Sequence, residues 1–440
     1  MFRAFIVLNR YRYMDISKIH SLFLKCSSIS IDTRKIEPNS LFIAIKGENF
    51  DANIFAKEAL NKGASYVVID NRNYFIDKRT ILVDNCLSTL QELAKYHRQY
   101  LNLPILALTG SNGKTTTKEL INVVLSKKYK TKATVGNLNN HIGVPLTLLS
   151  FNDKTEIGIV EMGANHQKEI EFLCELAMPD YGYITNFGKA HLEGFGGVEG
   201  VIKGKSEMYS YISRKDKLAF INLDDTIQVE KSKALNSYSF GINKDEANVN
   251  ISSISANPFV EIHFSDLGIQ THLIGLYNAN NVNAALTIGK YFGVDDKEIK
   301  DALEGYIPEN NRSQMISRGT NRIILDAYNA NPSSMAVAID NFLQLDDSKK
   351  VMILGDMFEL GTESAHEHKA IIDLLLDSKD VVYYLIGKEF YSQEVESINF
   401  HFFETFDAFS KYLHRMQIEN CSVLIKGSRG MALERTLQFL

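Results

Sequence analysis

The chain is poor in cysteine. Its four cysteines in 440 residues are Cys26, Cys86, Cys174 and Cys421, and no two of them stand in C-x-x-C spacing. This scarcity argues against a disulfide framework and against a cysteine-built metal site. We therefore expect free thiols, as in a protein of the reducing cytoplasm.

Long hydrophobic runs and a basic surplus are also absent. No stretch approaches the ~20 apolar residues of a transmembrane helix. The apolar residues 1–8 are followed by polar residues 9–12 without a small-residue cleavage site, which makes a poor signal peptide. The net charge of -5 argues against a general nucleic-acid binder. The sequence thus predicts no membrane span and no nucleic-acid partner.

The composition that is present is that of a soluble globular protein, with 45% apolar and 23% charged residues. A chain of 440 residues is too long for one ordinary core and suggests about three domains. Pro104 and Pro308 mark the two boundaries. We expect an extension over 1–13, whose removal should leave a soluble and active chain from Met14, and domains over 14–103, 104–308 and 309–440, in a monomer.

Short apolar runs alternate with helical patterns, which predicts an α/β fold. Residues 237–273 form short alternating runs, typical of a small antiparallel insert, and a helical pattern resumes at Gly275. The last third repeats a strand and helix rhythm that predicts a doubly wound, Rossmann-like sheet. The strands expected are 41–45, 66–69, 81–83, 105–108, 157–160, 181–185, 323–325, 351–354, 381–386 and 423–425.

The strongest local pattern is Thr109-Gly110-Ser111-Asn112-Gly113-Lys114-Thr115-Thr116-Thr117, between the strand 105–108 and a helical pattern over 118–125. Glycines let backbone N–H groups approach a polyphosphate, and the helix N-terminus adds its positive end. Lys114 supplies a cation and Thr115 a hydroxyl for a metal. The pattern is a short form of the P-loop and predicts a nucleoside triphosphate site.

Polar residues follow two further strands of the same region. Glu161 ends the strand 157–160, where a carboxylate can hold magnesium opposite Thr115 or can simply cap the next turn. His191 and Lys205 lie one loop apart after the strand 181–185, and by spacing alone a metal site and ordinary solvated side chains are equal alternatives. The polar loop 137–145 is either functional or a surface connection.

Three other polar stretches are candidates for binding. The loops 30–34 and 46–51 stand beside strands, where a ligand could sit, although solvated turns are the alternative. The asparagines of 278–283 are poor helix formers, so we expect them to bind something. Polar loops at 326–332, 355–361 and 426–430 each follow a strand and would line one crevice.

Eight motifs in order resemble the Mur ligases, the ATP-dependent amide-forming enzymes of peptidoglycan assembly. The resemblance covers nearly the whole chain from Met14. The motifs are T-G-S-N-G-K-T-T-T-K-E at 109–119, N-L-N-N-H-I-G-V-P at 137–145, E-M-G-A at 161–164, T-N-F-G-K-A-H-L-E-G-F at 185–195, K-G-K-S-E at 203–207, D-A-Y-N-A-N-P at 326–332, L-G-D-M-F-E-L-G at 354–361 and K-G-S-R at 426–429.

The resemblance implies three domains: one that holds the UDP end of the substrate, a central ATPase with a parallel sheet, and a C-terminal Rossmann-like ligase domain. It implies that ATP converts the substrate carboxylate into an acyl phosphate, which the incoming amine attacks. Among the family, the motifs are most similar to members that add D-alanyl-D-alanine to UDP-N-acetylmuramoyl-tripeptide. Roles in cell wall biogenesis, cell shape, the cell cycle and cell division would follow.

The resemblance also implies roles for individual residues. Lys114, Lys205, His191 and Glu161 would be catalytic, and two Mg²⁺ ions would be held by Thr115, Glu161, His191 and a Lys205 carbamylated by carbon dioxide. ATP would be bound by Gly110, Ser111, Asn112, Gly113, Lys114, Thr115, Thr116, Asn278, Asn281, Arg312 and Asp326. The UDP end would meet Asp32, Thr33, Arg34, Lys46 and Gly47, and the dipeptide would lie near Tyr328, Asn329 and Asn331.

Two positions depart from the family pattern. Asp51 is followed by Ala52-Asn53, where Gly-His is common, and Ala327 stands where many members have serine. The nearest alternatives are a sibling ligase with another amine and a folylpolyglutamate synthase, and the motifs at 326–332 and 354–361 favour the dipeptide-adding members over both. A GTPase is disfavoured because Asn243-Lys244-Asp245-Glu246 fails the N-K-x-D pattern, and an inactive binding module because the phosphate and metal positions are all present.

Overall fold

The computed structural model describes residues 14–309, 311–378, 380–416 and 418–440. The expected extension 1–13 lies outside these residues. The described chain divides into two compact units. The first comprises the residues up to 107 with 130–162 and 172–180, and the second comprises 108–129, 163–171 and 181–440.

The first unit is built on a parallel sheet of four strands in the order β1-β2-β5-β6. Helix α3 packs against α1 and α5. A short antiparallel hairpin, β3-β4, follows β2. The bounds are α1 Ile16–Phe23, β1 Ile29–Ser30, β2 Leu41–Ile43, β3 Lys46–Gly47, β4 Phe50–Asp51, α2 Ala56–Asn61, β5 Tyr66–Ile69, β6 Thr80–Leu82, α3 Cys86–Leu101, β8 Thr131–Ala133, α5 Gly143–Ser150 and β9 Ile157–Glu161, with short 3-10 turns at Thr33–Lys35, Ala52–Phe55 and Arg72–Tyr74.

Strand β7 (Ile105–Thr109) and helix α6 (Glu169–Ala177) run along the chain from one unit into the other. The second unit then continues with α4 Lys114–Leu125, β10 Tyr181–Ile184, α7 Leu192–Phe195, α8 Val198–Arg214, β11 Leu218–Asn222, α9 Thr226–Ser232, β12 Asn236–Ile242, β13 Val249–Ala256, β14 Phe259–Phe264, β15 Leu267–Ile274, α10 Ala279–Tyr291 and α11 Asp296–Glu304, with a 3-10 turn at Leu276–Asn278.

Strands β10 to β13 of this unit pair in parallel, and β13 to β15 pair antiparallel. The expected antiparallel insert is therefore present, although the β12 to β13 step is parallel. Helix α10 packs against α4. It begins at Ala279 and not at Gly275 as predicted, because Gly275 has φ +87 and a 3-10 turn intervenes.

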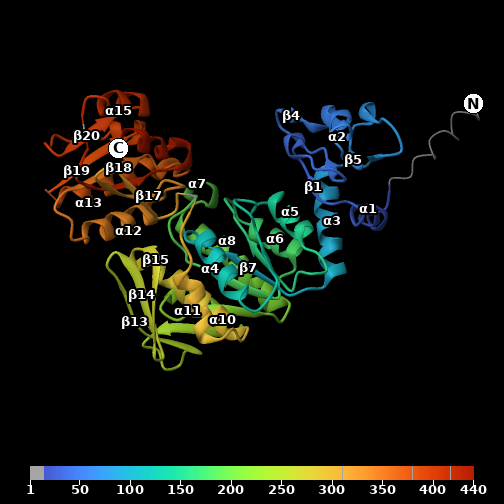
Figure 1. Cartoon of the computed structure of the whole chain (residues 1–440), viewed down its shortest axis with the longest axis horizontal. Coiled ribbons are helices and arrows are strands. Elements are labelled where there is room, and N and C mark those ends of the chain that lie inside the picture. The colour runs from blue at the N-terminus through green and yellow to red at the C-terminus, as the bar shows by residue number, and fades with distance from the viewer. Residues whose placement is uncertain (1–13, 310, 379, 417) are drawn as a thin grey trace, which may run out of the picture. The chain divides into compact units, whose positions relative to one another are not determined.

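The last third forms a six-stranded sheet in the order β16-β17-β21-β18-β19-β20, with only the β16–β17 pair antiparallel. Helices α12 and α13 lie on one face and α15 on the other (Figure 1), as a doubly wound sheet requires. The bounds are β16 Gln314–Arg318, β17 Asn321–Asp326, α12 Pro332–Leu343, β18 Lys350–Gly355, α13 Ser364–Leu376, β19 Val381–Ile386, α14 Lys388–Tyr391, β20 Phe400–Phe403, α15 Phe406–Leu413 and β21 Ser422–Lys426, with 3-10 turns at Gly361–Glu363, Arg429–Met431 and Leu433–Phe439.

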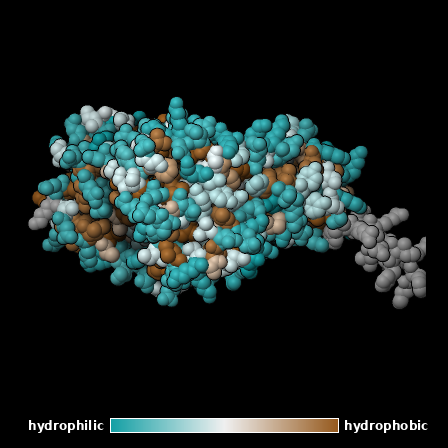
Figure 2. All heavy atoms as spheres, turned by 90° about the horizontal axis from the view of Figure 1, so that it is seen from below, coloured by the Kyte–Doolittle hydropathy of each residue, from teal (hydrophilic) through white to brown (hydrophobic). Residues whose placement is uncertain are grey.

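The surface carries no extended apolar belt on the face drawn in Figure 2, where hydrophobic residues stand in small groups among hydrophilic ones. Within the described ranges, no helix has the length and apolar character needed to cross a membrane.

Candidate active site

The glycine loop after β7 has the geometry expected of a phosphate cradle. Gly110 has φ +144, and a Cβ there would stand 2.0 Å from Thr185 Oγ1. Gly113 has φ +77 and is the N-cap residue of α4, and a Cβ there would stand 2.6 Å from Asn281 Oδ1. Only glycine fits both positions, which leaves the loop backbone bare at the positive end of a 12-residue helix.

Lys114 bends back over this loop. Its Nζ donates to the carbonyl oxygens of Gly110 at 2.8 Å and Ser111 at 3.1 Å. The ammonium group therefore already lies at the loop, where it could meet a phosphate oxygen. Thr115 and Thr116 follow in the first turn of α4 and are 5% and 9% exposed.

The segment after β10 fixes the shape of the glycine loop. Asn186 accepts from two loop N–H groups, Ser111 N to its carbonyl oxygen at 3.1 Å and Asn112 N to its Oδ1 at 3.1 Å. Ser111 Oγ donates to the Gly188 carbonyl oxygen at 2.6 Å. Asn186 and Gly188 stand in a motif that the sequence showed, but their part in holding the loop depends on the tertiary structure.

Asn278, which ends the 3-10 turn before α10, and Asn281 in the first turn of α10 bond to one another, and Asn281 lies against the glycine loop. Thr117 Oγ1 donates to Asn281 Oδ1 at 3.0 Å, and Asn281 Nδ2 donates to Asn278 Oδ1 at 2.8 Å. Asn278 Nδ2 donates to the Ile274 carbonyl oxygen at 2.8 Å. Both asparagines are almost fully buried. They connect α10 to α4, and the contact with adenine that the resemblance implies for them stays a prediction.

Lys205 is the most deeply buried cation of this region, at 1% exposure. Its Nζ donates to the Ala164 carbonyl oxygen at 3.1 Å and lies 5.0 Å from the centre of the Phe195 ring. Burial lowers the pKa of Lys205 well below its ordinary value, and the charge of Lys114 lowers it further, against the opposite effect of Glu169 and Glu207.

His191 stands at the N-cap position of α7, makes no capping hydrogen bond there, and meets a loop of the last third of the chain. Its Nδ1 forms a hydrogen bond with Glu359 Oε2, from the loop after β18. This hydrogen bond lowers the pKa of the Glu359 carboxyl below its usual value. Two residues earlier, Lys189 Nζ lies 2.6 Å from Glu367 Oε1, and Lys189 N donates to Ser333 Oγ at 2.8 Å.

A second connection joins the glycine loop to α12. Asn331 Nδ2 donates to Asn112 Oδ1 at 2.7 Å, while Asn331 Oδ1 caps α12 by accepting from Ser334 N at 2.9 Å. The structure thus brings one predicted dipeptide residue against a predicted ATP-binding residue. Tyr328 stacks under Arg312, whose Cζ lies 3.6 Å from the ring centre.

Asp326 ends β17 and is held by a buried lysine, Lys426, whose role the sequence pattern did not indicate. Lys426 Nζ lies 2.5 Å from Asp326 Oδ2 and 3.4 Å from the Asn329 carbonyl oxygen, and Ser313 N donates to Asp326 Oδ1 at 3.1 Å. The K-G-S-R motif was the available signal, since Lys426 is its first residue.

In the first unit, Glu161 is 1% exposed. Its Oε1 accepts from Asn139 Nδ2 at 2.8 Å, and its backbone N–H donates to Thr134 Oγ1 at 3.0 Å. The polar loop 137–145 therefore does more than connect, because Asn139 fixes the carboxylate. Sequence reasoning marked this loop but not that residue.

The predicted UDP residues gather at one edge of the four-stranded sheet. Asp32 follows β1 and Lys46 follows β2, and the carboxyl ends of parallel neighbours share an edge. Arg34 pairs with Asp32 at 2.8 Å and lowers the pKa of that carboxyl to about 2. Lys62 Nζ on the turn after α2 donates to the Thr33 carbonyl oxygen at 3.1 Å.

Asn53, which departs from the family pattern, is fully buried and bonded. Its Nδ2 donates to Asp51 Oδ1 at 2.7 Å and Asp70 Oδ1 at 2.8 Å, and its Oδ1 accepts from Asp70 N at 3.0 Å. It ties the end of the β3-β4 hairpin to the end of β5, which is a structural role.

By its chemistry, each of the residues predicted to hold magnesium in one site suits a cation bound through a nucleotide. Thr115 in the second unit and Glu161 in the first each offer a hard oxygen atom, as Mg²⁺ prefers, and phosphates and water commonly supply its other ligands. In the part of the chain that the structure describes, no three or more His, Cys, Asp or Glu side chains group to hold a metal by themselves. A nucleotide-dependent magnesium site needs no such group.

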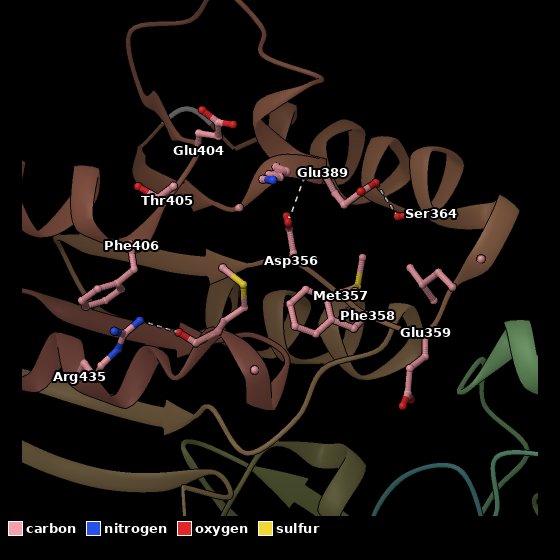
Figure 3. A pocket seen from close by; sticks show the side chains of 16 residues that line it. Asp356, Met357, Phe358, Glu359, Ser364, Glu389, Glu404, Thr405, Phe406 and Arg435 are labelled. Atoms are coloured by element: carbon pink, nitrogen blue, oxygen red, sulfur yellow. Dashed lines mark hydrogen bonds between the residues drawn. The ribbon is translucent and has the colours of Figure 1, made fainter. Parts of the chain in front are cut away.

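A cavity of about 540 Å³ opens in the C-terminal sheet, at the carboxyl ends of β18, β19 and β20. Figure 3 shows its mixture of acidic, basic and aromatic side chains, with Asp356 turned towards the residues around Glu389 and Glu359 directed away from Asp356. Its lining includes Glu359, so the cavity adjoins the contact with His191.

The parallel sheets and the glycine loop are those of a P-loop α/β protein, and the comparison with known families agrees with this class. The Mur ligase middle domain matches residues 108–289, the glutamate ligase domain of Mur ligases matches 311–429, and the catalytic domain of the Mur ligase family matches 25–98. The chain belongs to the Mur ligase family. Each matched range falls within one of the three predicted domains.

The relatives point to one branch of the family. The UDP-N-acetylmuramoyl-tripeptide--D-alanyl-D-alanine ligase of Bacillus subtilis is 35% identical over 429 residues, covering 94% of this chain and 92% of its own. The enzyme of the same name from Escherichia coli is 31% identical over 424 residues, covering 94% and 93%.

Solved structures agree with the sequence relatives. MurF from Acinetobacter baumannii superposes with a TM-score of 0.83 at 30% identity, covering 96% of this chain and 97% of its own. The MurF ligase of Thermotoga maritima, in complex with ADP, gives 0.81 at 26% identity, covering 95% and 97%. The three-domain Mur ligase fold that the sequence predicted is therefore confirmed. None of these comparisons supports the carbamate expected on Lys205.

Proposed function

We propose that this chain is an ATP-dependent ligase that joins D-alanyl-D-alanine to UDP-N-acetylmuramoyl-tripeptide and releases ADP and phosphate. The observation that carries the proposal is the glycine loop with Lys114 folded over it, in a chain that matches dipeptide-adding ligases over 94% of its length. A carboxylate is a poor electrophile, whereas an acyl phosphate has a good leaving group, so ATP makes the carbonyl attackable.

The glycine loop and Lys114 would hold the β- and γ-phosphates and stabilise the charge that develops as the γ-phosphoryl group moves. Bound Mg²⁺ would neutralise phosphate charge, held at one position by Thr115 and Glu161 and at a second with help from His191. Asn278, Asn281, Arg312 and Asp326 would complete the nucleotide site.

The two other substrates would meet residues at either end of the chain. Asp32, Thr33, Arg34, Lys46 and Gly47 would hold the UDP end, supported by their shared sheet edge. Tyr328, Asn329 and Asn331 would lie near the incoming dipeptide, supported by the hydrogen bond from Asn331 to Asn112.

The carbamate on Lys205 is a part of the expectation that the comparisons do not support. What speaks for a carbamate is its burial, because the neutral amine is the form that reacts with carbon dioxide, and burial favours that form. Restored activity of Lys205→Ala on adding a short carboxylate would support the modification. Full activity of the variant without an additive would rule it out.

The chain would act in the cytoplasm as a monomer, in precursor synthesis for the cell wall, and through it in cell shape and cell division. Its domains would be 14–103, 104–308 and 309–440. These statements rest on the family and on the free cysteines, Cys26, Cys86, Cys174 and Cys421.

The test is phosphate release from ATP with magnesium and UDP-N-acetylmuramoyl-tripeptide, with D-alanyl-D-alanine, a single amino acid, or glutamate with a folate as alternatives. Release that depends on both the nucleotide tripeptide and D-alanyl-D-alanine is expected. Dependence on another pair would move the chain to a sibling activity, and release without any acceptor dependence would refute the ligase.

A further inference from the structure

The contact between His191 and Glu359 joins two backbone positions of unusual conformation. His191 has φ +53 and Glu359 has φ +62, in the left-handed region that residues other than glycine seldom adopt. Glu193 N also donates to the Glu359 carbonyl oxygen at 3.3 Å. Two such conformations at one contact indicate that the surrounding structure holds both backbone positions in place.

The partner of His191 fixes the form of its ring. An ionised carboxylate only accepts hydrogen bonds, so the nitrogen that meets Glu359, Nδ1, carries a proton. In the neutral imidazole, Nε2 then carries the lone pair. Among the residues that the structure describes, Nε2 of His191 has no protein partner, so it is the nitrogen left to bind something else. A histidine that binds a metal commonly donates its other N–H to a carboxylate in this way.

We propose that Glu359 is a positioning residue of the ligase, which holds His191 as the Nδ1-protonated tautomer so that Nε2 can bind a divalent cation at the nucleotide. The inference rests on the proposed function and deepens it. Glu359 belongs to the loop after β18 and lines the cavity of the C-terminal sheet (Figure 3), whereas His191 belongs to the segment that holds the glycine loop. His191 is therefore held in the metal-binding tautomer only when the loop after β18, which carries Glu359, is in place.

A neighbouring ion pair offers a matched control. Lys189 of the same segment pairs with Glu367 of helix α13, with 2.6 Å between Nζ and Oε1, and this pair does not include His191. If Glu359 merely fastened the two segments, loss of Glu367 would have the same consequences as loss of Glu359.

The experiment compares the full chain with Glu359→Ala, Glu359→Gln and Glu367→Ala. Nitrogen NMR of histidine-labelled protein without metal reports the tautomer of His191, and electron paramagnetic resonance of Mn²⁺ with ADP reports cation affinity. We expect Glu359→Ala to lose the Nδ1-protonated form and to bind Mn²⁺ about 10–100-fold more weakly. Glu359→Gln, which keeps an acceptor oxygen, should keep the tautomer, and Glu367→Ala should match the unaltered chain in both readouts.

An unchanged tautomer or unchanged Mn²⁺ affinity in Glu359→Ala would overturn the proposal, as would equal losses in Glu367→Ala. If Glu359→Ala does not fold, Glu359→Gln decides, since loss of the tautomer there would contradict the role of the acceptor oxygen. Neither readout uses a peptide substrate. A failed ligase assay with these readouts intact would therefore refute the proposed function and not the role of Glu359.

Discussion

At the scale of single residues, Lys114 is the side chain on which phosphate chemistry depends most directly. Its Nζ lies at the carbonyl oxygens of Gly110 and Ser111, inside the glycine loop. We expect Lys114→Ala to lower ATP turnover by more than about 100-fold, because it removes a charge that stabilises the transferring phosphoryl group. Steady-state phosphate release measures the loss. Lys127→Ala, an exposed position in the turn after the same helix, is the control and should leave the rate unchanged.

Asn283, unlike Lys114, is a polar side chain without hydrogen-bond partners among the described residues. It is fully buried in α10, and neither its Nδ2 nor its Oδ1 has a hydrogen-bond partner among the described residues. A buried amide without partners costs about 1–3 kcal/mol. Asn283→Leu, which keeps the branching of the side chain, should therefore raise the free energy of unfolding by about 1 kcal/mol, as measured by denaturant titration. A lower stability would show that the amide is satisfied in solution.

At the scale of elements, the packing of α1 on α3 depends on two neutral histidines. His20 Nε2 and His97 Nδ1 lie 3.0 Å apart, and His97 Nε2 lies 3.0 Å from the Phe151 carbonyl oxygen. Burial, and secondarily the charge of His97, lowers the pKa of His20 from 6.5 to about 4. Burial also lowers the pKa of His97.

These shifts predict acid destabilisation of the first unit. A group with a lowered folded-state pKa stabilises fully above its unfolded value, and this contribution is lost as the pH falls from about 6.5 to about 4. The slope per proton is at most about 1.4 kcal/mol per pH unit. Thermal unfolding between pH 7 and 4 measures it, and His20→Leu should flatten the profile. If the stability of His20→Leu fell as steeply with pH as that of the unaltered chain, groups other than His20 would cause the acid destabilisation.

At the scale of the whole molecule, the glycine loop and the proposed UDP residues belong to different compact units. ADP with magnesium should slow hydrogen exchange at 110–116 and in the segment 185–191, where backbone N–H groups meet phosphate. UDP should slow exchange at 32–34 and 46–51. Exchange followed by mass spectrometry distinguishes the two patterns. Protection of 110–116 by UDP alone would contradict the assignment of the UDP residues.

Much of this architecture could be predicted from the sequence because it is local. The strand 66–69 agrees with β5 residue for residue, and the strand, glycine turn and helix around Lys114 are as expected. Apolar periodicity and glycine placement act within a few residues of chain, so they are visible in a linear pattern. Helix boundaries that depend on tertiary packing were predicted less well: α10 begins at Ala279, four residues after the predicted start at Gly275.

The sequence by itself determined which residues could carry the chemistry, since motif order and spacing are properties of the chain. Only the tertiary structure decided their partners. His191 and Glu359 are 168 residues apart, Thr117 and Asn281 are 164 apart, and Lys426 and Asp326 are 100 apart. Such pairs form because burial in a low-dielectric interior makes each polar group require a partner, and the topology of the sheets determines which partner comes within reach.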